Sequence, residues 1–132
     1  MTAMADISVK KADETTSITY TAVVASAGDR TSAIWKSLTV GSAPGHNPSC
    51  SMLSRWNDKK TARRVELSFA YPQTATATDG SVSVVNILPI NVAAVVPQGM
   101  PQATIDEAVA QAMNLFASVL VKASIKSGYA PV

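Results

Sequence analysis

The feature of this sequence that most constrains its fold is the alternation of apolar and polar side chains over residues 64–71. Successive side chains of an extended chain point to opposite faces, so residues two apart share a face. One face then holds Val65, Leu67, Phe69 and Tyr71, and the other holds Arg64, Glu66, Ser68 and Ala70. The pattern predicts a β-strand with one face in a core and the other in solvent.

Positive charge is concentrated just before this strand and at its start. Five of the eleven Lys and Arg residues lie within residues 55–64, against one acid, Asp58. The net charge of the chain is only +2, so any argument from charge rests on its position. A local excess of this kind is typical of surfaces that meet phosphate. It is equally typical of a solvated turn, and the residues alone leave both interpretations open.

Composition bounds the class of protein. The 132 residues suffice for one domain and are too few for two ordinary ones, so we expect a single domain over residues 1–132. With 47% hydrophobic and 15% charged residues, the chain is expected to fold. The first residues have no long apolar stretch after a basic head, so we do not expect them to be a secretory leader, and the apolar segment 105–125 carries several polar residues. We therefore expect a cytoplasmic protein that does not enter a membrane.

No motif in the sequence predicts a metal, a cofactor or a small-molecule substrate. There is no glycine-rich phosphate loop, no dinucleotide-binding motif and no pair of carboxylates near a loop end. The chain has one cysteine, Cys50, so it cannot form an intrachain disulfide. Cys50 and the single histidine, His46, are too few ligands for a zinc site built from Cys and His. These two could form a nucleophile and base, but their spacing does not show that they meet. We interpret them as a loop histidine and a buried thiol.

Several strands are predicted around the central one. An N-terminal hairpin is expected at residues 6–10 and 15–25, followed by strands at 33–40 and 49–56. If the 49–56 strand pairs with the next through the turn at 57–62, Arg55 lies beside Arg64 and the basic cluster is a patch on a sheet. Residues 73–81 predict a loop with an Asp-Gly turn. In the apolar run 82–96, Pro89 predicts an edge, a bulge or a bend.

A helix is predicted after this sheet. Thr104 and Glu107 have the spacing of a capping box, and Gly128 predicts the helical end. Beyond Asn114 the helix is apolar nearly all round, which indicates burial on more than one side. A second subunit is the simplest cover, so we expect an obligate oligomer. The apolar positions at helical spacing that we assign to a dimer interface are Val109, Met113, Phe116 and Leu120.

The order of these elements, with a basic strand pair in the middle and helices at the end, resembles the coat protein of the single-stranded RNA bacteriophages (the levivirus type). The most specific local match is to a Pseudomonas member of that family, and comprises Arg55, Lys60, Thr61, Ala62, Arg64, Val65 and Leu67 with spacing intact. The length, the small-residue loop and the closing Ser127-Gly128-Tyr129 also match. The resemblance therefore extends over nearly the whole chain.

The resemblance implies an α+β fold, in which an N-terminal β-hairpin and a five-stranded antiparallel sheet are followed by C-terminal helices in an interlocked dimer. Dimers would assemble into an icosahedral capsid around single-stranded genomic RNA, in a virion assembled in the cytoplasm of a bacterial host. An RNA operator hairpin would dock on the sheet face opposite the helices and repress replicase translation. No enzymatic activity is implied.

The resemblance also implies roles for particular residues. Arg55 and Arg64 match basic positions that contact the hairpin, and Lys59 and Lys60 would add phosphate contacts of the salt-dependent kind. Ser68 stands where the Pseudomonas member has a lysine. The positions implied to contact unpaired bases are Val85, Ile87 and Asn91.

Two other classes of function remain as alternatives. One is a dimeric cytoplasmic module that binds single-stranded nucleic acid and forms no shell. The other is an enzyme built on His46 and Cys50, which has the least support from the sequence.

Overall fold

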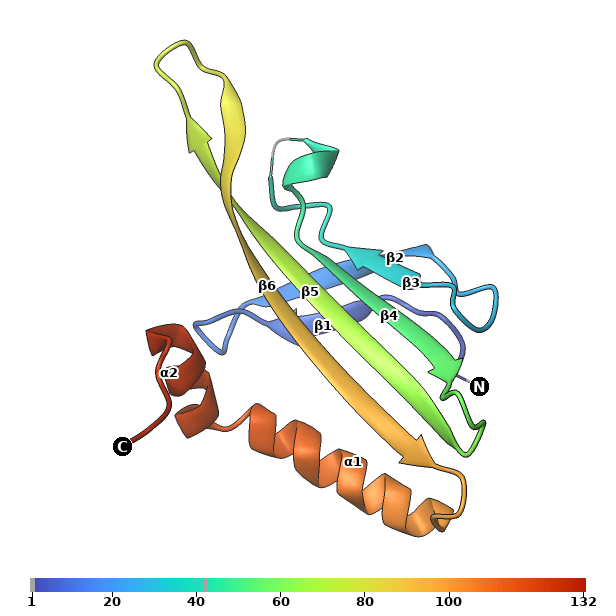
Figure 1. Cartoon of the computed structure of the whole chain (residues 1–132). Coiled ribbons are helices and arrows are strands. Elements are labelled where there is room, and N and C mark those ends of the chain that lie inside the picture. The colour runs from blue at the N-terminus through green and yellow to red at the C-terminus, as the bar shows by residue number, and fades with distance from the viewer. Residues whose placement is uncertain (1, 42) are drawn as a thin grey trace. The chain divides into compact units, whose positions relative to one another are not determined.

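The structure is a computed structural model that describes residues 2–41 and 43–132; Met1, at the start considered above, and Ser42 lie outside them. The strands are β1 (Ile7–Lys10), β2 (Ser17–Val24), β3 (Ala33–Lys36), β4 (Ser49–Trp56), β5 (Ala62–Thr76) and β6 (Val82–Pro97) (Figure 1). The helices are a 3-10 helix, η1 (Pro44–His46), and two α-helices, α1 (Gln102–Phe116) and α2 (Val119–Ser127). The chain divides into a sheet unit up to Val95 and a helical unit from Val96 to Val132.

The strands form one six-stranded sheet in the order β1-β2-β3-β4-β5-β6. The strand pairs β1–β2, β2–β3, β3–β4 and β4–β5 are antiparallel. The predicted fold class, an antiparallel sheet followed by C-terminal helices, is confirmed. One detail differs, because the N-terminal hairpin continues into four further strands where the resemblance implied five.

The strand count is lower because β5 and β6 are long, at 15 and 16 residues, and run through their prolines. Pairing of β5 with β4 ends at Ala70, which is the partner of Ser49, so Pro72 lies past the last β4 partner. Pro89 lies in β6, the edge strand of this sheet, where a missing N–H is tolerated. Of the three alternatives predicted for Pro89, an edge, a bulge or a bend, the edge is confirmed.

The loop predicted at residues 73–81 is confirmed for residues 77–81 and wrong for residues 73–76, which continue β5. The connection to β6 is a tight turn in which the Ala77 N–H donates to the Ser81 carbonyl at 2.8 Å. Asp79 Oδ1 accepts from the Ser81 amide and hydroxyl, and Gly80 has φ +88°, a conformation that favours glycine. The predicted Asp-Gly turn is thus present at the tip of the β5–β6 hairpin, which extends past β4 (Figure 1).

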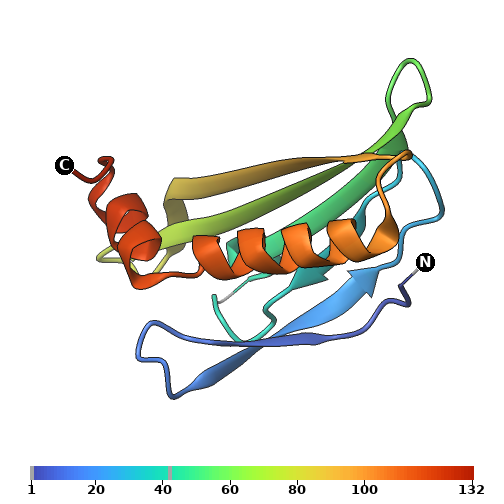
Figure 2. The same ribbon diagram turned by 90° about the horizontal axis from the view of Figure 1, so that it is seen from below.

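The helical unit begins earlier than predicted and is broken. Helix α1 starts at Gln102 with Pro101 at the N-cap and no side-chain cap, so the predicted capping box of Thr104 and Glu107 is wrong. Pro101 presets the backbone, and Pro has no N–H to leave unsatisfied there. The two helices meet at an angle of 53° (Figure 2), and Ser118 caps α2 by accepting from the Val121 amide. The predicted helical stop is confirmed, since Gly128 has φ +81° and closes α2.

Little of the chain is buried. Among residues 2–41 and 43–132, the buried hydrophobic side chains are Ala33, Trp35 and Ala62. Trp35 also donates its indole N–H to the Ala5 carbonyl at 2.8 Å, which ties the N-terminal segment to the sheet. Neither α1 nor α2 has a buried residue. A chain with 47% hydrophobic residues therefore leaves much of its apolar surface uncovered.

The turn of the N-terminal hairpin provides a pH-dependent prediction. Asp13 accepts from the amides of Thr15 and Thr16 and from the Thr16 hydroxyl at 2.6 Å, and these bonds lower its pKa from 3.8 to about 2. Because the folded-state pKa is depressed, this contribution to hairpin stability is present above pH 3.8 and is lost as pH falls towards 2. We expect Asp13→Ala to speed amide exchange at Lys11 at neutral pH, with the two proteins converging at acid pH. A constant difference at every pH would contradict this assignment.

Candidate nucleic-acid interface

The register of the sheet separates two faces. Directly opposite residues point the same way, so the pairs Thr21–Lys36, Lys36–Ser49 and Ser49–Ala70 mark one face across four strands. On β4 and β5 the same face continues through the opposed pairs Ser51–Ser68, Leu53–Glu66 and Arg55–Arg64. We call this surface the polar face. It holds Arg64, Glu66, Ser68 and Ala70, the polar half of the alternation over residues 64–71.

The basic patch predicted for the middle of the sheet is present. Arg55 and Arg64 are direct partners across β4 and β5, as the predicted pairing required. Both approach one oxygen of Glu66: Arg55 Nη2 lies 3.3 Å and Arg64 Nε 2.6 Å from Oε1. The hydrogen bond from Arg55 and the charge of Arg64 lower the pKa of Glu66. The arginine side chains are 37% and 45% exposed, so they remain within reach of an anion.

Two further predicted residues, Lys59 and Lys60, lie in the turn between these strands. Asn57 organises the turn, since its Oδ1 accepts from the Thr61 amide at 2.8 Å and its carbonyl accepts from the Lys60 amide at 3.1 Å. Lys60 has φ +54°, and both lysines are exposed. A shallow hollow of about 300 Å³ at this end is lined by Asp29, Arg30, Arg55, Trp56, Asn57, Asp58 and Lys60. The basic cluster thus extends from the sheet onto its end.

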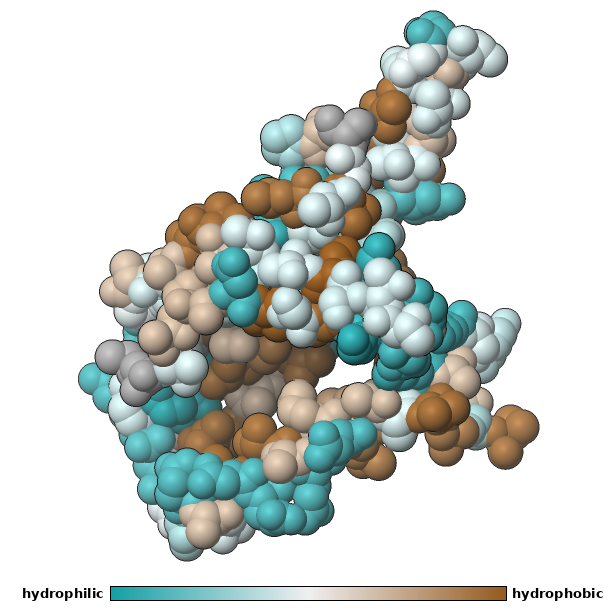
Figure 3. Space-filling model, turned by 180° about the vertical axis from the view of Figure 1, so that it is seen from behind, coloured by the Kyte–Doolittle hydropathy of each residue, from teal (hydrophilic) through white to brown (hydrophobic). Residues whose placement is uncertain are grey.

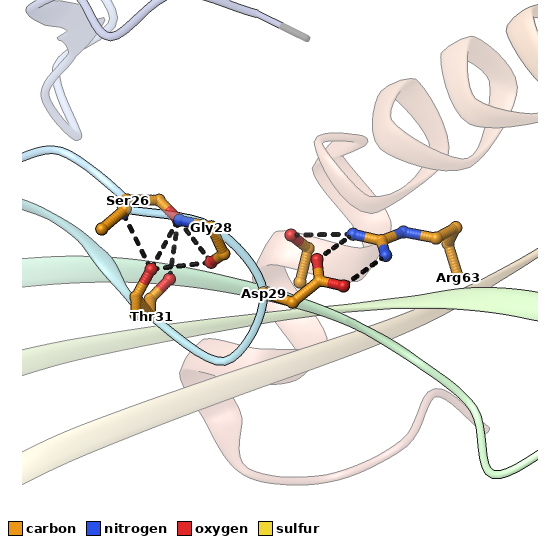
Figure 4. Close-up of polar contacts among 7 residues, drawn as sticks. Ser26, Gly28, Asp29, Thr31 and Arg63 are labelled. Atoms are coloured by element: carbon orange, nitrogen blue, oxygen red, sulfur yellow. Dashed lines mark hydrogen bonds and ion pairs between the residues drawn. The ribbon is translucent and has the colours of Figure 1, made fainter. Parts of the chain in front are cut away.

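Arg63 is withdrawn from the basic cluster by the fold. It is the partner of Trp56, one position out of phase with Arg64, and so lies on the opposite face. Its guanidinium forms a two-pronged ion pair with Asp29, with Nη1 2.8 Å from Oδ2 (Figure 4). It also lies 4.9 Å from the centre of the Trp56 ring. Ser26 and Thr31 close the same loop through their hydroxyls. Arg63 therefore anchors the β2–β3 loop and is not a free cation.

The remaining predicted residues lie on the polar face by phase. Ser68 is opposite Ser51 on that face. On β6, Asn86 donates to Gln73 Oε1 at 3.1 Å, so Asn86 shares the face of the odd-numbered β5 residues, which include Phe69 and Tyr71. The odd-numbered β6 positions then share the face of Arg64. Those predicted for base contact, all exposed, are Val85, Ile87 and Asn91.

Lys36 is a member of the polar face that was not predicted from the sequence. Lys36 lies between Thr21 and Ser49, and so adds a cation on β3. Its alternation with Trp35 was the available signal, because Trp35 marked the other face. Glu66 was predicted on this face next to Arg64, but its contact with Arg55 depends on the pairing of β4 with β5.

The opposite face carries an apolar groove of about 710 Å³. Its residues come from β1 to β5 and from nearby loops, and they are Ile7, Val9, Lys10, Lys11, Ala12, Ile18, Tyr20, Trp35, Val40, Cys50, Phe69 and Tyr71. Aromatic rings of Tyr20, Phe69 and Tyr71 follow one another at centroid distances of 6.2 and 6.4 Å. Exposed hydrophobic side chains are visible as brown areas in Figure 3. The groove is an apolar surface without a cover in its own unit.

The position of Cys50 argues against a catalytic role for it. Cys50 lies in β4 between Trp35 and Phe69, and burial raises the pKa of its thiol. A nucleophilic cysteine needs a lowered pKa, so this environment disfavours the reactive thiolate. In the part of the chain that the structure describes, no group of three or more His, Cys, Asp or Glu residues is arranged to hold a metal ion.

The residues predicted for a dimer interface are exposed on two helices. Val109, Met113 and Phe116 form an apolar stripe on α1 and are 48%, 45% and 50% exposed. Leu120 is 61% exposed and lies on α2, beyond the break, so it does not continue the α1 stripe.

Within residues 2–41 and 43–132, neither α-helix alone has the length and apolarity to span a membrane. The bent pair of α1 and α2 meets both criteria only when the two helices are taken together.

Comparison with known proteins identifies the fold. The capsid protein of bacteriophage GA matches with a TM-score of 0.72 at 14% identity, over 95% of each chain. The coat-protein fold of the leviviruses is the fold of this chain. Virus-like particles of bacteriophages NT-214 and ESE058 contain chains that match with TM-scores of 0.83 and 0.79, at 16% and 18% identity, over 99% of this chain and 100% of theirs.

Sequence comparisons add no further relative. No protein-family model matches the chain. No curated protein matches it by sequence either. The likeness to the levivirus coat proteins is thus carried by the fold.

Proposed function

We propose that this chain is the coat protein of a single-stranded RNA bacteriophage, which assembles through dimers into a capsid. The observation that carries the proposal is the match over nearly the full length to chains from virus-like particles. The proposal places the protein in the virion after assembly in the cytoplasm of a bacterial host. Its role would be structural, without enzymatic activity.

The uncovered apolar surface supports a dimer. The groove offers a large apolar area on one face of the sheet, and the helices expose Val109, Met113, Phe116 and Leu120. Helices of a second copy would cover the groove of the first, and the reverse, as a two-fold interface requires. The edge strand β6 offers an unpaired row of backbone groups, which a second β6 would satisfy. Such an interlocked dimer would give the chain the core that it lacks alone.

The polar face supports RNA as the second partner. Phosphate contacts from Arg55, Arg64, Lys59 and Lys60 would supply salt-dependent affinity without sequence information. Unpaired bases of an RNA hairpin would be read by Val85, Ile87 and Asn91, which share the face of these arginines by strand phase. Ser68 would contact the RNA more weakly than a lysine at the same position. The same hairpin contact would repress replicase translation.

Electron microscopy of the purified full-length protein tests assembly. We expect uniform hollow or RNA-filled spheres a few tens of nanometres across, because the matching chains come from virus-like particles. Small oligomers in every buffer would contradict the capsid and favour a dimeric module that binds single-stranded nucleic acid.

Phe116→Asp tests the helical interface. Phe116 would be buried only in the proposed dimer, where loss of a buried phenylalanine costs about 3–5 kcal/mol and an unpaired carboxylate in an apolar contact adds to this cost. We expect no particles and an aggregated or unfolded chain, measured by size-exclusion chromatography and circular dichroism. Asn114→Asp introduces the same charge at an exposed polar position of α1 and should still assemble. A stable, folded Phe116→Asp monomer would exclude the interlocked dimer.

The double variant Arg55→Ala/Arg64→Ala tests the RNA face. We expect particles to form, RNA affinity to fall, and the slope of log affinity against log salt to flatten by about one to two units, since two phosphate contacts are lost. Lys11→Ala/Lys126→Ala removes the same charge from the N-terminal turn and α2, and should leave the slope near that of the wild type. Equal slopes for the wild type and the arginine variant would remove these residues from the RNA site.

A further inference from the structure

Glu66 occupies the centre of the basic patch and contacts both of its arginines. Arg55 and Arg64 are direct cross-strand partners, and like charges in that position repel each other. The strand fixes the position of Glu66, because Glu66 follows Arg64 by two residues on β5 and therefore lies on the same face. Its Oε1 is the atom that both guanidiniums approach, at 3.3 and 2.6 Å. The carboxylate thus offsets the repulsion between the two cations.

The same contact occupies donors that a phosphate would use. Arg64 points Nε at Glu66 and Arg55 points Nη2 at it. A guanidinium has five N–H donors, so each arginine keeps others for an anion. An incoming phosphate must nevertheless share the two cations with a carboxylate that already lies against them. The patch of Arg55, Arg64 and Glu66 presents a net charge of +1 where the two arginines alone would present +2.

The other acids near the basic cluster do not have this position. Asp29 is engaged by Arg63 on the opposite face. Asp58 lies in the turn after β4 and forms no ion pair with any residue of the described ranges 2–41 and 43–132. Glu66 is therefore the acid whose charge bears most directly on Arg55 and Arg64.

We infer that Glu66 is a specificity-determining residue of the RNA face: it competes with phosphate for Arg55 and Arg64 and so weakens the binding of unstructured RNA. This inference rests on the proposed function, because it assumes that these arginines contact RNA. An RNA that adds base contacts elsewhere on the polar face offsets the competition, whereas an RNA that offers only phosphates does not. Glu66 acts through the arginines and is a positioning residue for them.

Glu66→Gln in the full-length protein tests the inference, with a short oligouridylate as the probe of phosphate-only binding. Glutamine keeps the size and an acceptor oxygen but removes the charge. We expect affinity for the oligouridylate to rise about three- to tenfold, as two exposed ion pairs are released, and its salt slope to steepen by about one unit. Asp58→Asn adds the same net charge in the adjacent turn and should change the affinity by less than Glu66→Gln.

Several outcomes would overturn the inference. Unchanged or weaker binding by Glu66→Gln would do so, and Glu66→Ala serves as a second variant if the first does not fold. An equal gain in Asp58→Asn would show that net charge alone decides affinity. The gain must also vanish when Glu66→Gln is added to Arg55→Ala/Arg64→Ala, since the effect passes through those side chains. If the arginine variant itself binds like the wild type, the proposed RNA face fails, which is a distinct result.

Discussion

The structure depends on apolar surface that one chain leaves uncovered. Across the sheet, Ala22, Trp35, Cys50 and Phe69 stand in register and continue into an apolar groove. Within its own unit the groove has no cover, and no residue of α1 or α2 is buried. Burial of apolar surface is the main favourable term in folding, so a single chain that leaves this surface in water forgoes much of the available stabilisation. The proposed dimer follows from this shortage more directly than from any single contact.

A single register serves both faces of the sheet. The turn built on Asn57 sets Arg55 opposite Arg64 and, in the same step, Cys50 opposite Phe69. A slip of one residue would bring arginines to the groove and aromatic rings to the polar face. Arg63 is a cation on the face opposite the polar face, where it pairs with Asp29 and lies over the Trp56 ring. Core formation and the basic patch are therefore specified together.

The strand pattern could be predicted closely where the alternation was strict. The strand at Ser49–Trp56 and the pairing of Arg55 with Arg64 both agree with the sequence interpretation. Prediction failed where local signals competed. Gln73 to Thr76 look like a loop because the residues are small and polar, but they continue β5, since the neighbouring strand β6 extends the sheet and threonine is a good strand former. Thr104 and Glu107 have capping-box spacing, yet the N-cap is Pro101, three residues earlier than expected.

The sequence by itself determined which residues share a face, because side-chain direction in a strand follows from period-two alternation. It also determined the helical stop at Gly128, which depends on one residue's backbone freedom. Only the tertiary structure decided which cations are available. Arg63 is engaged by an acid 34 positions away, Lys36 joins the polar face through two strand pairings, and Glu66 reaches Arg55 on the neighbouring strand. Such contacts join residues that are distant in sequence, and no local pattern specifies them.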